Sequence, residues 1–219
     1  MKTRHIRYAA VLACMLTMPA VHAATIYSQT PATNLEITSD VDGFFRADDL
    51  SLGGADTVRS VHWRGDYGIN DSPQAVDVFT INFYSDSSGP DSLLQSFAVG
   101  NAVMRTDTGA ASSAGNDLYE YTADLGTGIA LTGSTTYWIS IFNDTTADTN
   151  DDWRWSALVG AGNGQISLDL TDWFLDDNLA RYYFTLDNSN VVVPLPAAAY
   201  LFSSGLLAML GWMRRSAKV

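Results

Sequence analysis

Cysteine is nearly absent from this sequence: among 219 residues only Cys14 is a cysteine, and it lies in an apolar run near the N-terminus. The rest of the chain has none, so disulfide bonds cannot hold it together. About 170 residues lie between the two apolar ends of the chain, enough to bury a sizeable hydrophobic core. Folding must therefore depend on that core, with or without a metal ion.

Basic residues are scarce between the two ends. All 24 acidic residues lie between Glu36 and Asp187, and only six arginines accompany them, which leaves a net charge of about −18. This balance excludes binding to nucleic acid through phosphate neutralisation. Such an acidic surface is typical of a soluble protein that repels its own copies. The alternative is affinity for divalent cations, because most of the acids are aspartates in turn-like contexts.

The common catalytic motifs are also absent. There is no histidine pair of a zinc hydrolase, no phosphate-binding loop, no nucleophile elbow and no dinucleotide fingerprint. His62 is the only histidine after residue 23, and a structural or surface role is favoured for it over a place in a catalytic triad. Glycoside hydrolysis needs two facing carboxylates, but aspartates are so plentiful that a pair carries little information. The sequence therefore predicts that this protein is not an enzyme.

Residues 1–23 have the pattern of a secretory signal peptide. A basic start (residues 1–8) precedes an apolar stretch that is too short to span a bilayer. Val21 and Ala23 supply the small side chains that signal peptidase requires for cleavage after Ala23. The alternative is a lipoprotein acylated on Cys14, but the bulky Leu12 stands where a small residue is usual.

The C-terminal residues 193–219 contain an apolar segment that predicts a transmembrane helix over residues 195–213. At 1.5 Å per residue it reaches roughly 28 Å, just sufficient for the hydrocarbon core of a bilayer. Arg214 and Arg215 follow at once and favour a cytoplasmic C-terminus. With the N-terminus exported, the acidic domain then lies outside the inner membrane. Taken alone, this pattern describes an ordinary single-pass anchor.

The order of features at this end is more specific than an ordinary anchor. Val193, Pro194, Leu195, Pro196 and Ala197 precede the apolar segment and its arginine pair. This arrangement resembles the tripartite PEP-CTERM sorting signal in its VPLPA variant. The resemblance implies recognition by an exosortase, a membrane-embedded transpeptidase-like enzyme that cuts near the motif and transfers the protein onward. The two prolines hold an extended backbone, which is the form that a peptidase cleft generally binds.

Residues 24–187 predict an all-β domain, joined to the sorting signal by a linker over residues 188–192. Short aromatic and β-branched runs alternate with Gly, Asp, Asn and Ser clusters, and neither an internal repeat nor a convincing amphipathic helix is present. Phe79, Ile81 and Phe83 share one face of a strand. We expect nine or ten strands in an antiparallel two-sheet sandwich of jelly-roll type. The predicted strands cover residues 25–28, 58–64, 76–85, 93–99, 119–125, 135–143, 153–159, 165–170 and 181–186.

The same region resembles the sandwich ectodomains often found in PEP-CTERM proteins. The resemblance rests on scattered pieces, among them residues 45–50, 61–67, 79–84 and 136–141. It implies no established activity.

Calcium is the one cofactor that the sequence suggests. Asp144, Asp148, Asn150, Asp151 and Asp152 offer five oxygen-bearing side chains within nine residues. Calcium takes six to eight oxygen ligands, and a loop of this density could supply many of them. The spacing is not that of an EF-hand. The alternative is a solvated acidic hairpin loop, in which Asp and Asn simply form turns.

Two tryptophans suggest a carbohydrate platform. Trp153 and Trp155 share one face of a predicted strand, and flat rings stack on sugar faces. The alternative is that both rings belong to the core.

The preferred function is a non-catalytic surface or matrix-associated protein, held in the inner membrane with a periplasmic domain and then released to the cell surface or medium. A carbohydrate-binding module for exopolysaccharide is the second hypothesis, and a glycan-active hydrolase or lyase is the third. The expected partners are signal peptidase, exosortase and the inner membrane.

Overall fold

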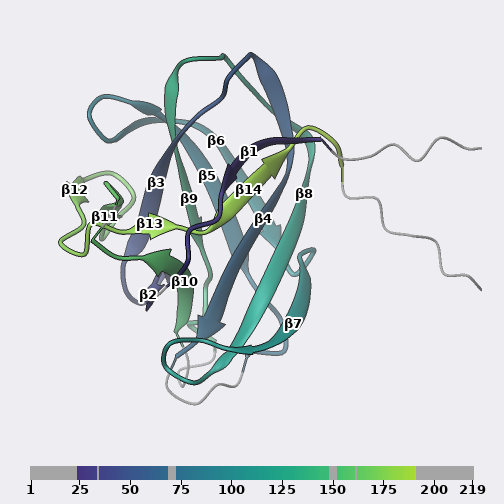
Figure 1. The fold of residues 1–219 in the computed structure, drawn as a ribbon, viewed down its shortest axis with the longest axis vertical. Helices are drawn as coiled ribbons and strands as arrows, with labels where there is room; N and C mark the ends of the chain where they lie inside the picture. The colour runs from purple at the N-terminus through teal and green to yellow at the C-terminus, as the bar shows by residue number, and fades with distance from the viewer. Residues whose placement is uncertain (1–23, 34, 69–72, 148–151, 161, 191–219) are drawn as a thin grey trace, which may run out of the picture.

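The computed structural model (Figure 1) describes residues 24–33, 35–68, 73–147, 152–160 and 162–190. Within these ranges every regular element is a β-strand, which confirms the all-β prediction. The predicted signal peptide, with Val21 and Ala23, and the sorting segment 193–219 lie outside the described residues. No helix in the described ranges is long and apolar enough to cross a membrane.

The strands form two antiparallel sheets, which confirms the predicted sandwich in its general form. The eight-stranded sheet contains β1 (Thr25–Gln29), β2 (Leu35–Thr38), β4 (Asp56–Tyr67), β7 (Met104–Ala111), β8 (Asp117–Leu131), β10 (Trp153–Leu158), β13 (Arg181–Tyr182) and β14 (Phe184–Asp187). The six-stranded sheet contains β3 (Phe45–Ser51), β5 (Phe79–Asp86), β6 (Pro90–Gly100), β9 (Thr136–Phe142), β11 (Gln165–Ser167) and β12 (Trp173–Leu175).

Strand β4 is the centre of the larger sheet. Its residues pair with β8 along one side, and with β14 and then β10 along the other. Where β10 meets β4, a Cβ at Gly65 would lie 2.4 Å from the carbonyl oxygen of Arg154 and 2.7 Å from the Trp153 ring. Only glycine allows this close approach, so Gly65 lets the wide indole of Trp153 lie against the β4 backbone.

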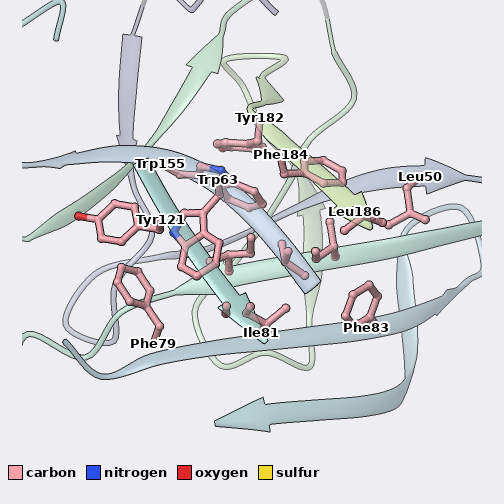
Figure 2. Packing of buried hydrophobic residues seen from close by; sticks show 14 of the residues in the cluster. Leu50, Trp63, Phe79, Ile81, Phe83, Tyr121, Trp155, Tyr182, Phe184 and Leu186 are labelled. Atoms are coloured by element: carbon pink, nitrogen blue, oxygen red, sulfur yellow. The ribbon is translucent and has the colours of Figure 1, made fainter. Parts of the chain in front are cut away.

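The core lies between the two sheets and is rich in aromatic side chains (Figure 2). Phe79, Ile81 and Phe83 all point into it, as their alternation predicts. Trp63 stacks on Tyr121, with ring centroids 5.5 Å apart. Burial of so much apolar area is the main source of stability for a domain that has no disulfide.

A second, smaller cluster covers the outer face of the six-stranded sheet. It contains Ala47, Tyr84 and Trp138, with the half-buried Trp173 of β12 packed against it. The Trp138 Nε1 donates a hydrogen bond to Asp86 Oδ1 at 2.7 Å. The face of β5 opposite Phe79, Ile81 and Phe83 is therefore partly apolar, and Trp173 of β12 contacts Tyr84 there, with ring centroids 5.5 Å apart.

Four strands were missed by the sequence analysis: β2, β3, β7 and β12. Strand β3 was not predicted because its buried side chains include the charged Arg46 and Asp48, and charged residues are rarely buried. Arg46 forms a buried ion pair with Asp176 at 2.8 Å, and Asp48 accepts a hydrogen bond of 2.6 Å from the Tyr182 amide. Strand β7 is almost wholly exposed at one side of the large sheet and so has no apolar pattern.

The first and last described strands lie side by side. Strand β1 pairs with β14, and the Asn188 amide donates to the Ala24 carbonyl at 3.2 Å (Figure 1). Asp187 pairs with Ser60 on β4, whereas Trp153 pairs with Tyr67, seven residues further along that strand. At about 3.3 Å per residue this places the start of β10 roughly 23 Å from the paired residues Thr25 and Asp187 of β1 and β14. The acidic loop before β10 therefore begins and ends at the opposite end of the sandwich.

Candidate functional site

The structure corrects the prediction of a carbohydrate platform at Trp153 and Trp155. The two rings do share one face of β10, but that face is the core side and both residues are 0% exposed. The Trp155 ring stacks on Tyr182 with centroids 4.6 Å apart and lies within the aromatic core (Figure 2). A sugar cannot reach either ring, because the second sheet covers them.

The predicted calcium loop is described only at its ends. Asp148, Asn150 and Asp151 lie outside the described residues. Asp144 Oδ1 accepts hydrogen bonds from the amide and the hydroxyl of Thr146, at 3.1 and 2.6 Å, and Asp152 is exposed. Among the described residues no group of three acidic, histidine or cysteine side chains is placed to hold a metal ion. Calcium binding by this loop stays a prediction.

A buried carboxylate joins the two ends of this loop. The Asp40 side chain is 0% exposed and accepts hydrogen bonds from the amides of Thr145 and Trp153, at 3.3 and 3.2 Å. Desolvation by burial raises the pKa of Asp40 to about 6, although these amide hydrogen bonds act in the opposite direction. Asp40 therefore holds the base of the acidic loop, a role that is structural.

A second buried network lies near the same end of the sandwich. The Tyr67 hydroxyl donates to Asp77, and Arg105 Nη1 approaches Asp77 Oδ2 at 3.0 Å. The Asn143 side chain lies 3.3 Å from the Tyr67 hydroxyl. Burial raises the pKa of Asp77, against the opposing effects of Tyr67 and Arg105. With its polar groups engaged with one another, this network joins β4 and β7 to the residue that follows β9 and to the segment that precedes β5.

The sorting residues Val193, Pro194, Leu195, Pro196, Ala197, Arg214 and Arg215 lie outside the described residues. The part of the chain that the structure describes reaches Asn190, whose side-chain amide donates to Asp124 Oδ1 at 3.2 Å.

The outer face of the larger sheet carries a site that the sequence did not predict. Val61 and Trp63 point into the core, so His62 between them points outward, and its side chain is 38% exposed. Its Nε2 lies 2.6 Å from Asp187 Oδ2, and its Nδ1 lies 2.8 Å from Thr122 Oγ1. Because a carboxylate can only accept, Nε2 carries a hydrogen. Asp187 and Thr122 lie on β14 and β8, the two neighbours of β4.

The next outward position on β4 continues this site. Arg64 Nη2 contacts Glu120 Oε1 at 2.5 Å, and its guanidinium lies 4.4 Å from the centre of the Tyr183 ring. Glu120, Tyr183, His62 and Asp187 line an open pocket of about 270 Å³, which we call the outer-face pocket. Its remaining lining residues are Thr25, Trp63, Tyr121, Thr122 and Thr185.

The outer-face pocket is equipped for hydrogen bonding in both directions. The carboxylates of Glu120 and Asp187 accept, and the hydroxyls of the threonines and tyrosines both donate and accept. The chain Thr122–His62–Asp187 has the order of a nucleophile, base and acid. However, Thr122 lies within the ladder of β8, which pairs with β4 on one side and with β7 on the other. Its amide neighbours are therefore engaged in strand pairing and are not directed at a developing oxyanion, so the geometry favours binding over acyl transfer.

The sequence predicts which β4 residues share the face of this pocket, but not their partners on other strands. The alternation of apolar and polar residues in β4 shows that His62 and Arg64 share a face opposite Val61 and Trp63. Their partners come from strands roughly 60 and 120 positions later, and no local pattern predicts that pairing.

Comparison with known proteins found no relatives: no protein-family model, no curated protein and no solved structure matches this chain.

Proposed function

We propose that this chain is an exported, non-catalytic surface or matrix-associated protein that an exosortase sorts through its C-terminal segment. The observation that carries the proposal is the order of residues 193–219: the VPLPA string, a 19-residue apolar stretch and an arginine pair. The signal-peptide pattern of residues 1–23 accounts for export, and the lack of disulfides does not count against it because the domain has a large aromatic core.

The arrangement of the domain is consistent with attachment by one end. Since β1 and β14 are paired, the segments before residue 24 and after residue 190 join the sandwich at the same end. A membrane segment after the linker would hold the domain by that end and direct the acidic loop toward the exterior. The charge of about −18 over the domain keeps such molecules apart and hydrated at a crowded surface.

We assign the sandwich to the jelly-roll type. In the larger sheet the order β1, β14, β4, β8 brings together the first, last, fourth and eighth strands. In the smaller sheet β3, β9, β5 and β6 are neighbours. Both orders interleave early and late strands, as in double Greek keys.

Mass spectrometry of the mature C-terminus tests the sorting proposal. In cells that contain the sorting enzyme we expect the protein to have lost the residues that follow the VPLPA motif, and in cells that lack the enzyme we expect it to retain them. A Pro194→Ala, Pro196→Ala double variant should stay uncut in the membrane fraction. Ser203→Ala, within the apolar stretch but outside the motif, is the matched control and should be processed normally. An intact C-terminus in cells with the enzyme contradicts the proposal.

A further inference from the structure

We propose that the outer-face pocket binds one hexose unit of a neutral polysaccharide. The proposal goes beyond sorting, because it concerns what the domain holds rather than where the chain is sent. It also differs from the carbohydrate platform predicted at Trp153 and Trp155, because those two rings are buried in the core and cannot contact a sugar.

One polar group of the pocket leaves a hydrogen bond unmade. Asp187 Oδ1 is buried and has no partner in the structure, although the other oxygen of the same carboxylate binds His62. A buried acceptor or donor without a partner costs about 1–3 kcal/mol. The unmet acceptor belongs to a side chain that lines the pocket, and a ligand hydroxyl, which both donates and accepts, suits such an acceptor.

The exposed surface of the pocket has the same character. The Glu120 side chain is 51% exposed, and Thr25 and Thr185 also line the pocket. The Arg64 guanidinium lies over the Tyr183 ring, so that ring is held in place. The part of the Tyr183 ring that the guanidinium does not cover gives an apolar surface for sugar C–H groups, next to carboxylates that accept from its hydroxyls.

Charge and size narrow the ligand class. The pocket lining contains the acidic Asp187 and Glu120 and no arginine or lysine. Because the domain also carries a net charge of about −18, polyanions such as uronic acid polymers are repelled. The volume of about 270 Å³ lies just below the range of about 300–1,000 Å³ that is typical of drug-sized ligands. It therefore suits one small polar unit. The pocket is open, so that unit can belong to a longer chain.

The test uses the full, uncleaved chain in mild detergent, so the outcome does not depend on sorting. Affinity electrophoresis through gels that contain dextran, mannan, galactan or hydroxyethyl cellulose should show retardation by at least one of these neutral polymers. A gel with alginate, a polyanion, should show none. Migration unchanged by all four neutral polymers, or retardation by alginate alone, overturns the proposal.

Substitutions in the outer-face pocket test whether the polysaccharide binds there. Tyr183→Ala and Glu120→Gln should each weaken retardation at least tenfold. Asp124→Asn is the matched control, because Asp124 lies on the same face of β8 two positions beyond Thr122 but outside the pocket lining. It should change the affinity less than twofold. If Tyr183→Ala lowers the melting temperature, Glu120→Gln decides, since Glu120 is a surface residue. Equal affinity of Glu120→Gln and the unmodified chain, or an equal loss in Asp124→Asn, overturns the assignment to this pocket.

Discussion

Replacing Trp155 with phenylalanine should destabilise the domain clearly more than the same replacement at Trp153. Both rings are fully buried on the same face of β10, so each change removes a similar apolar area and leaves a similar cavity. That shared cost is about 2 kcal/mol for the lost ring atoms. Comparing the two variants cancels this shared cost. The difference between their free energies of unfolding then reports the hydrogen bonding of the two indole nitrogens.

The two nitrogens differ. Trp155 Nε1 donates to the Tyr183 carbonyl at 2.9 Å, whereas Trp153 Nε1 is buried without a partner in the structure. Trp155→Phe loses a hydrogen bond to a part-buried carbonyl, a further cost of about 0.5–1.5 kcal/mol. Trp153→Phe removes an unpaired donor and regains free energy of similar size. We therefore expect Trp155→Phe to be the less stable variant by about 2 kcal/mol.

Urea unfolding of the full chain in detergent, followed by far-ultraviolet circular dichroism, measures this difference. The slope of free energy against urea should be the same in both variants, so that the midpoints report stability. Trp173→Phe is the control, because Trp173 is only half-buried and lies outside the main core. Equal midpoints for the two β10 variants, or a lower midpoint for Trp153→Phe, refute the hydrogen-bond argument. No destabilisation in either variant refutes the burial of both rings.

Two further predictions concern pH and calcium. Burial raises the pKa of Asp48 to about 7 and that of Asp40 to about 6, so the folded chain binds more protons than the unfolded chain between about pH 4 and pH 7. The free energy of unfolding, and with it the melting temperature, should therefore fall as pH rises through that window. Asp48→Asn should make this fall smaller. A melting temperature that rises over the same window contradicts the raised pKa values. For calcium, the full chain should melt several degrees higher with the ion than with a chelator, because saturation at 100 times the dissociation constant adds about 2.7 kcal/mol. An Asp144→Asn, Asp152→Asn variant should lose that gain, and identical melting curves for the unmodified chain discard the calcium hypothesis.

Local periodicity is what the sequence determined by itself. The alternation in β5 predicted that Phe79, Ile81 and Phe83 share a face, and all three lie in the core. The alternation in β10 likewise predicted a shared face for Trp153 and Trp155. Side chains two positions apart in a strand point the same way regardless of the rest of the protein, so these inferences needed no tertiary information.

The tertiary structure decided which side of each strand is covered and which distant residues meet. Trp153 and Trp155 face the second sheet rather than solvent, because β10 pairs with β4 in the sandwich. Arg46 is tolerated inside β3 because Asp176, 130 positions later, supplies a carboxylate at 2.8 Å. His62 likewise meets Asp187, 125 positions later, because β4 and β14 are paired in the same sheet. Strand order depends on the packing of the whole chain, and a local pattern contains no information on it.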